Sequence, residues 1–245
     1  MPAPGDCLNL TIDSLAYRGS GIARHEGLVV FVPGVAPGEP VRVRIGKVHR
    51  NYAEAQLLEV LEPSHGRIPP CCRLPGGLRV PGCVYDHLAY PAEVAAKQRQ
   101  FEEFLHRLPG ADTRALIPPC ASPRERHYRN KIVLHTQFTP REPRPRLGYV
   151  GEDNRTVVDI PACPLAREAI NTTLHGVRHG PEFRRLRSDE SITLRWTAAD
   201  GTVWWRGDRP PAHLAPLTEQ APFGTIQVPA DSFYQVNPEV GAELV

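Results

Sequence analysis

The chain has 245 residues, of which 41% are hydrophobic and 23% are charged, and its formal net charge is only +2. These values are ordinary for a globular protein, and they exclude a binder that holds nucleic acid by bulk positive charge, though not one with a local basic face. No apolar run approaches the ~20 residues of a membrane span. The first residues have neither the charged region nor the apolar region of a signal peptide. We therefore expect a cytoplasmic protein with no membrane segment.

The first sixty residues predict a small β barrel. Leu8, Leu10 and Ile12 alternate with polar residues, which is the period-2 pattern of a half-buried strand. Further strands are expected at residues 28–32, 41–45 and 53–60. Gly19-Ser20-Gly21 predicts a turn between strands. We expect five short strands in this stretch, closed into a barrel of the OB type, because closure removes exposed sheet edges.

A positive stripe follows the later strands of this barrel. It consists of Arg42, Arg44, Lys47, His49 and Arg50, with the aromatic Tyr52 beside it. Such a stripe can hold phosphates, and a nearby aromatic ring can stack on a base. The alternative is that Arg42 and Arg44 are only the solvated face of an amphipathic strand. The barrel context favours RNA binding, so we predict Arg42, Arg44, Lys47 and Arg50 as RNA contacts.

Residues 63–110 predict a connector rich in proline and glycine, followed by one helix. The connector carries Cys71, Cys72 and Cys83. Pro91 suits the beginning of the helix, and Pro109-Gly110 suits its end. The apolar stripe expected on its buried side is Val94, Phe101, Leu105 and Leu108.

Residues 111–229 predict an α+β domain with an antiparallel sheet. Its strands are expected at residues 132–138, 147–150, 156–160, 192–196, 202–205 and 225–228. A turn is expected at Glu152-Asp153-Asn154, and a helix from Pro164 to about His179. Residues 207–224 are expected to be a proline-rich loop.

The last residues, 230–245, predict an extended run that ends at Asn237 and leads into a helix. Pro238 suits the first turn of a helix, where its missing N–H would have no partner. Glu239 lies in the same turn, where the helix dipole favours a negative charge. Val240 and Leu244 then begin an apolar stripe at helical spacing.

Two stretches resemble a known family. Phe233-Tyr234-Gln235-Val236-Asn237 resembles the Phe-x-Gln-Val-Asn signature of the RNA 5-methyluridine (uracil-C5) methyltransferases. Residues 15–39, with Phe31-Val32-Pro33-Gly34, resemble the TRAM domain with which that family begins. The resemblance implies that Gln235 contacts S-adenosyl-L-methionine. It also implies a central domain whose basic run faces RNA, matched here by Arg129 and Lys131. The alternative is that this run is the start of a strand with solvated charges.

In the family, a Rossmann-like methyltransferase domain follows the signature. The chain contains no Asp-Leu-Phe-Cys-Gly-x-Gly loop, no Asp-Pro-Pro-Arg segment and no cysteine in the context of the family's nucleophile. We therefore expect that the methyltransferase domain is missing, that the chain is truncated before it, and that the chain alone is inactive. Uracil-C5 methylation needs a nucleophile and a base close to the uracil.

The family carries a cysteine-ligated iron–sulfur site, so the resemblance also implies a 4Fe–4S cluster. Such clusters are normally held by four thiolates. The matching positions are Cys71, Cys72, Cys83 and Cys163, but Val80 stands where the family has a further cysteine. Two alternatives are open: a zinc site that includes His87, or a lost site whose thiols are ordinary buried residues. The remaining cysteines, Cys7 and Cys120, are expected to be buried residues without a metal.

These observations divide the chain into four expected parts: residues 1–62, 63–110, 111–229 and 230–245. The function expected from them is RNA recognition within an S-adenosyl-L-methionine-dependent uracil-C5 methyltransferase that acts on ribosomal or transfer RNA, as a monomer. The first alternative is a stand-alone TRAM-type RNA-binding module without catalysis. The second is a radical methylthiotransferase, but there the TRAM domain normally follows the catalytic domain, and no Cys-x3-Cys-x2-Cys motif is present here.

Overall fold

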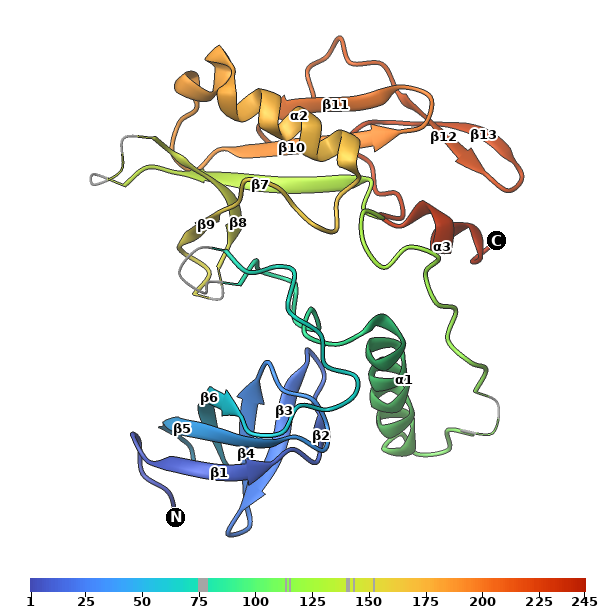
Figure 1. The fold of residues 1–245 in the computed structure, drawn as a ribbon. Helices are drawn as coiled ribbons and strands as arrows, with labels where there is room; N and C mark the ends of the chain where they lie inside the picture. Colours follow the sequence, from blue (N-terminus) through green and yellow to red (C-terminus); the bar gives the residue numbers. More distant parts are fainter. Residues whose placement is uncertain (75–78, 113, 115, 140–141, 143, 152) are drawn as a thin grey trace. The chain divides into compact units, whose positions relative to one another are not determined.

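The structure is a computed structural model that describes residues 1–74, 79–112, 114, 116–139, 142, 144–151 and 153–245. The chain forms two compact units (Figure 1). The first unit contains residues 1–71 and 82–119, and the second contains residues 72–81 and 120–245. The four-part division expected from the sequence stays a prediction about domain boundaries.

The first unit is built on one curled sheet of six strands. These are β1 (Cys7–Thr11), β2 (Ser14–Leu15), β3 (Ser20–His25), β4 (Leu28–Pro33), β5 (Pro40–Val48) and β6 (Tyr52–Val60). Their order in the sheet is β1-β5-β6-β4-β3-β2, with β4 and β6 parallel and the other pairs antiparallel. The sheet curls around its own apolar face (Figure 1).

The alternation along β5 shows how the sequence produces this curl. Val41, Val43 and Ile45 are at most 1% exposed, and the side chains between them are exposed. The pairing with β6 shifts register twice along β5, and such irregularities bend a strand. Gly21 of β3 allows the close packing inside, because a Cβ there would lie 2.2 Å from the Val35 side chain. The strand predicted at residues 41–45 is confirmed.

The prediction missed β3. Gly19-Ser20-Gly21 was expected to be a turn, but the turn lies at residues 17–19, and Ser20 and Gly21 begin the strand. Gly21 pairs with Leu15 and with Val32, so it is a central position of the sheet. Glycine is a turn signal in sequence, but here the buried position requires it because no side chain fits.

Helix α1 (Tyr90–His106) follows the connector, and its bounds agree with the expectation. Its buried stripe does not: Phe101 is 54% exposed and Leu108 is 44% exposed. The helix instead packs through Ala92 and Ala96 on the small cluster around Leu88. Small residues allow a close approach but carry little hydrophobicity, so apolar periodicity selected the wrong face.

The second unit contains an antiparallel sheet of five strands and a separate hairpin. The sheet comprises β7 (Lys131–Gln137), β8 (Arg146–Val150), β9 (Val157–Asp159), β10 (Ser191–Thr197) and β11 (Gly201–Arg206) in the order β11-β10-β7-β8-β9. The hairpin pairs β12 (Leu217–Ala221) with β13 (Gly224–Val228). Helix α2 (Glu168–His179) covers one face of the sheet through Ile170, Leu174 and Val177, and a short turn of 3-10 helix, η3 (Pro181–Arg185), follows it (Figure 1). The predicted antiparallel α+β arrangement is confirmed for this unit.

Two expected boundaries in this unit are wrong. Helix α2 begins at Glu168 rather than Pro164, because Ala166 forms a bridge with Arg129 before the helix starts. Residues 207–224 are not all loop, since they contain β12. Glu219 of β12 points inward and is 5% exposed, so its charge hid the strand pattern. Glu152 of the predicted turn lies outside the described residues.

Helix α3 (Pro238–Ala242) begins where the sequence predicted, with Pro238 in its first turn. Asn237 caps it, because the Asn237 side chain accepts a hydrogen bond from the Val240 N–H at 3.3 Å. Among the helices described, none combines the length and the apolar character needed to cross a membrane.

Candidate site at the terminal signature and the RNA-facing residues

A buried arginine holds the chain segment that leads into the terminal signature. Arg195 of β10 is 1% exposed and pairs with Glu219 of β12, with 2.9 Å between Nη2 and Oε1. Its Nη1 donates to the carbonyl oxygens of Pro229, Ala230 and Ser232 at 3.0–3.2 Å. One guanidinium therefore fixes three carbonyl groups just before the signature, and its planar fork suits such a role.

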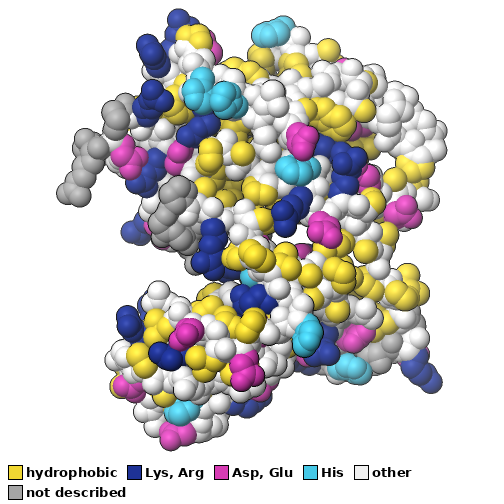
Figure 2. Space-filling model, viewed as in Figure 1, with side chains coloured by type: hydrophobic (Ala, Val, Ile, Leu, Met, Phe, Trp, Pro, Cys, Tyr) yellow, Lys and Arg dark blue, Asp and Glu magenta, His cyan; other side chains and the backbone are white. Residues whose placement is uncertain are grey.

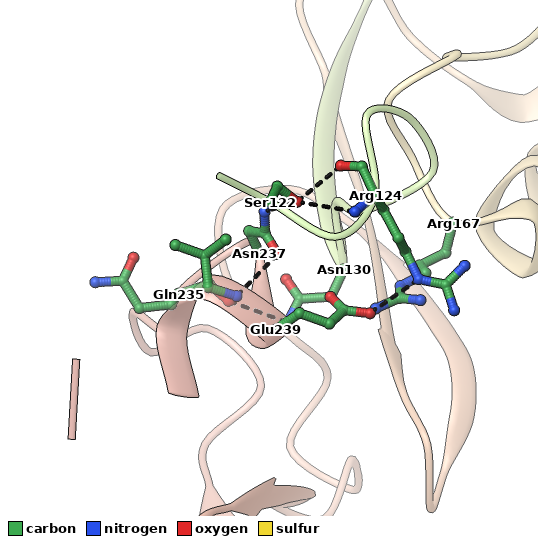
Figure 3. A network of polar contacts seen from close by, with 8 residues as sticks. Ser122, Arg124, Asn130, Arg167, Gln235, Asn237 and Glu239 are labelled. Atoms are coloured by element: carbon green, nitrogen blue, oxygen red, sulfur yellow. Dashed lines mark hydrogen bonds and ion pairs between the residues drawn. The ribbon is translucent and has the colours of Figure 1, made fainter. Parts of the chain in front are cut away.

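Asn130 holds the signature itself. Its backbone N–H donates to the Val236 carbonyl at 2.9 Å, and its side-chain Nδ2 donates to the Gln235 carbonyl at 3.3 Å. The Asn130 carbonyl accepts from the Trp196 N–H at 2.7 Å, which joins the signature to β10. Figure 3 shows Asn130 beside Gln235, together with the Asn237 side chain, whose Nδ2 donates to Ser122 Oγ at 3.0 Å.

Glu239 attaches the first turn of α3 to the rest of the unit. Its carboxylate accepts hydrogen bonds from Arg167 and from Arg124 Nε, the latter at 3.1 Å (Figure 3). Arg167 also lies over the Trp196 ring, 5.0 Å from its centre. Burial acts to raise the pKa of Glu239, but the hydrogen bonds from Arg167 and Arg124 outweigh it and hold the pKa below its usual value. Glu239 is therefore charged at neutral pH.

Gln235, the residue expected to contact the cofactor, is exposed. Its backbone is held by Asn130, while its side chain points away from the network of contacts (Figure 3). A Cβ on Gly241 of α3 would lie 2.9 Å from the Gln235 Cβ, so glycine allows the helix to approach this side chain. The arrangement presents one amide on a fixed backbone.

Sequence reasoning did not identify Arg195, Glu219, Arg167 or Asn130 as parts of this site. Arg195 lies on the face of β10 opposite Ile192 and Leu194, and both faces are buried. Asn130 stands inside the run that was compared with an RNA-facing segment. The available signal for Arg195 was a single charged residue within a strand. Such a residue ordinarily indicates a face exposed to solvent.

The predicted RNA contacts on β5 and beside it, Arg42, Arg44, Lys47 and Arg50, are all exposed. Arg42 pairs with Glu59 of β6 at 3.1 Å, and Lys47 stands opposite Glu54 in the sheet. On the face shown in Figure 2, Lys and Arg side chains lie among Asp and Glu side chains. Tyr52 contacts the Phe31 ring edge to face and stacks on His49 with 4.3 Å between ring centres.

Arg129 and Lys131, the other predicted RNA contacts, are only partly exposed. Lys131 lies 5.9 Å from the centre of the Trp205 ring, and burial, followed by the charge of Arg195, lowers its pKa. Burial acts to lower the pKa of Arg129, but a hydrogen bond with Tyr128 and electrostatic attraction to Tyr128, Tyr149 and Cys163 together outweigh it, so the pKa is raised. Both cations touch neighbouring side chains, and their contact with RNA stays a prediction.

The cysteines expected to hold a metal belong to both units. Cys71 and Cys83 lie in the first, and Cys72 and Cys163 lie in the second. Among the residues that the structure describes, no three His, Cys, Asp or Glu side chains gather into a metal-binding group. Val80 is 3% exposed and its N–H donates to the Cys72 carbonyl at 2.9 Å. The ligand set stays a prediction, and we derive no chemistry from a cluster.

The structure also places Cys7, Cys120 and His87. Cys7 and Cys120 are exposed, so the expectation that they are buried is wrong. His87, proposed as a zinc ligand, is 1% exposed and its Nε2 lies 2.9 Å from the Val35 carbonyl oxygen. That nitrogen therefore has a structural partner inside the first unit.

Comparisons with known proteins agree with the two resemblances. The TRAM domain model matches residues 3–58. An uncharacterized RNA methyltransferase of Synechocystis sp. is 38% identical over 180 residues, which cover 74% of this chain and 38% of the relative. The 23S rRNA (uracil(1939)-C(5))-methyltransferase RlmD of Pectobacterium atrosepticum is 33% identical over 175 residues, which cover 71% of this chain and 38% of the relative. The matched part of the chain thus corresponds to less than half of each curated relative.

The fold is also found in a solved structure. The crystal structure of Pyrococcus abyssi tRNA (uracil-54, C5)-methyltransferase in complex with S-adenosyl-L-homocysteine is similar to 96% of this chain, with a TM-score of 0.66 and 17% identity, and the match covers 63% of that protein. At this identity the likeness concerns the fold alone. Residues 3–58 are therefore a TRAM domain, and the chain is homologous to the RNA uracil-C5 methyltransferases.

Proposed function

We propose that this chain is the RNA-recognition portion of an S-adenosyl-L-methionine-dependent RNA (uracil-C5) methyltransferase whose substrate is ribosomal or transfer RNA. The observation that carries the proposal is the terminal signature: Asn130 fixes its backbone, Arg195 fixes the segment just before it, and the Gln235 side chain is left exposed. A backbone segment held in this way around one exposed amide suits a ligand contact. The TRAM domain supports RNA as the partner.

S-adenosyl-L-methionine would supply the methyl group, and Gln235 is the residue here that would contact it. One amide cannot hold such a ligand, because small-molecule sites bury most of the ligand in a concave pocket. We therefore propose that residues 1–245 alone bind RNA and transfer no methyl group. The Rossmann-like domain of a complete enzyme would supply the rest of the pocket.

RNA binding is tested across a salt series with unmodified ribosomal and transfer RNA. Removing one cation that binds a phosphate should flatten the dependence of log affinity on log salt by about 0.7–0.9. Joint replacement of Arg42, Arg44 and Arg50 by Ala should therefore lower the slope by about 2 and weaken binding. The control is joint replacement of Arg99, Arg107 and Arg114, which are also exposed and remove the same charge. Equal effects of both triple variants would show that only bulk charge matters.

The absence of methyl transfer is tested separately. Residues 1–245 are incubated with labelled S-adenosyl-L-methionine and RNA that lacks 5-methyluridine, beside a complete uracil-C5 methyltransferase as the positive control. We expect no label in RNA from the chain, because uracil activation needs a nucleophile and a base within hydrogen-bond reach of the ring. Formation of 5-methyluridine by these residues alone would contradict this part of the proposal.

A further inference from the structure

The turn between β2 and β3 presents an aromatic ring and a cation to solvent. Tyr17 is 83% exposed, although large aromatic side chains usually bury much of their area, and Arg18 beside it is exposed too. The turn is tight: the Gly19 N–H donates to the Ala16 carbonyl at 2.9 Å, and the Ala16 N–H donates to the Ser20 carbonyl at 2.8 Å. Neither Tyr17 nor Arg18 takes part in the core of the sheet.

The backbone of Arg18 is in an unfavourable conformation. Its φ is 71°, in the left-handed region where glycine and asparagine are the usual residues. A long side chain gains nothing there from burial, because Arg18 is exposed. Strained non-glycine positions concentrate at functional sites. The structure thus keeps arginine where glycine would fit the turn better.

The base of this turn is anchored to the rest of the first unit. Gln100 of α1 donates from Nε2 to the carbonyl oxygens of Leu15 and Ala16, at 3.2 and 3.0 Å. Tyr85 holds the same amide, with 3.0 Å between its hydroxyl and Gln100 Oε1. The Tyr85 ring also packs against Gly19, where a Cβ would lie 3.2 Å from it. The turn is therefore a fixed platform, which lowers the entropy cost of binding a partner.

We propose that Tyr17 and Arg18 form an RNA contact, in which the Tyr17 ring stacks on an unpaired base and the Arg18 guanidinium binds the adjacent phosphate. An exposed ring beside a cation is the combination that holds single-stranded nucleic acid, since every base offers a flat face for stacking. This contact rests on the proposed RNA-binding function. The contact lies at the β2 end of the sheet's strand order, whereas the RNA contacts predicted on β5 lie near the β1 end.

The probe is a labelled RNA stem–loop with a uridine-rich loop, compared with a blunt duplex of the same stem. Tyr17→Ala should weaken binding to the stem–loop by roughly 5- to 100-fold, the range for removal of one stacked base. Tyr17→Phe keeps the ring and should bind within about twofold of the wild type. Binding to the duplex should change little, because its bases are not available for stacking.

Arg18→Gly separates the binding role from a structural role. Glycine relieves the strain at φ 71°, so the variant should melt at a higher temperature than the wild type. It should nevertheless bind the stem–loop more weakly and with a salt slope smaller by about 0.7.

The matched control for Tyr17→Ala is Phe223→Ala, which removes an aromatic side chain that is 67% exposed at the β12–β13 turn. This control should leave RNA binding unchanged.

The outcomes distinguish the two levels of the proposal. Unchanged binding by Tyr17→Ala and Arg18→Gly, in a chain that binds the stem–loop, would overturn this contact and leave RNA binding intact. Equal losses on stem–loop and duplex for Tyr17→Ala would overturn the stacking. A wild-type chain that binds neither RNA would overturn both this contact and the RNA-binding function on which it rests.

Discussion

Replacement of Arg195 by Met should lower the free energy of unfolding of the second unit by about 3–5 kcal/mol, because it leaves a buried carboxylate without its partner. Glu219 is 5% exposed and has Arg195 as its ion-pair partner. The carbonyl groups of Pro229, Ala230 and Ser232 lose their donor in the same change. The effect should therefore exceed that of an average surface substitution several-fold.

Urea denaturation followed by tryptophan fluorescence measures this effect. All three tryptophans of the chain, Trp196, Trp204 and Trp205, lie in the second unit, so the signal reports that unit. The control is Arg185→Met, because the pair of Arg185 with Glu182 is exposed and should contribute less than about 1 kcal/mol. A double change, Arg195→Met with Glu219→Leu, should recover part of the stability, since no buried charge then remains. A destabilisation no larger than that of Arg185→Met would contradict the role assigned to Arg195.

The sequence predicted much of the fold because hydrophobic alternation follows burial closely in this chain. The strands at residues 41–45 and 132–138 and the beginning of α3 at Pro238 all carry local signals, and the structure confirms them as β5, β7 and α3. Strands β3 and β12 were missed for opposite reasons. In β3, Gly21 lies at a crowded position where no side chain fits, and in β12 a buried charge interrupts the apolar pattern.

The candidate site was predictable only in part. The signature around Gln235 was recognisable because its residues are contiguous, whereas the residues that hold it and the segment before it come from β10, β12 and the segment before β7. Their pairing depends on long-range contacts that no local pattern records. Arg195 and Glu219 are an example: each alone resembles a solvated charge, and only their meeting explains why both are buried.

The second large effect is expected at another buried ion pair, in the first unit. Glu39 is fully buried and accepts hydrogen bonds from Arg67 Nε and Nη2, both at 2.6 Å. It also accepts from the N–H groups of Ala36 and Ser64, so the carboxylate ties the connector to the curled sheet. Burial acts to raise the pKa of Glu39, but the bonds from Arg67, Ala36 and Ser64 outweigh it and leave the pKa below its usual value of 4.5.

Arg67→Met should therefore destabilise the first unit by about 3 kcal/mol near neutral pH, and the deficit should shrink in acid. In the wild type, a lowered pKa in the folded state adds stability above the usual value of 4.5, and this stability disappears as the pH falls through the folded value. In the variant, the buried carboxylate without its cation binds a proton more readily, so acid relieves it.

The measurement equilibrates each protein in urea at a series of pH values and then applies a brief deuterium pulse at one fixed pH. Mass analysis of peptides that cover residues 28–48 reports how much of the first unit is folded. Arg42→Met is the matched control, because Arg42 and Glu59 are 51% and 55% exposed and their pair should contribute less than about 1 kcal/mol at every pH. A deficit for Arg67→Met that stays constant from neutral pH into acid would show that the charge of Glu39 is not what Arg67 stabilises.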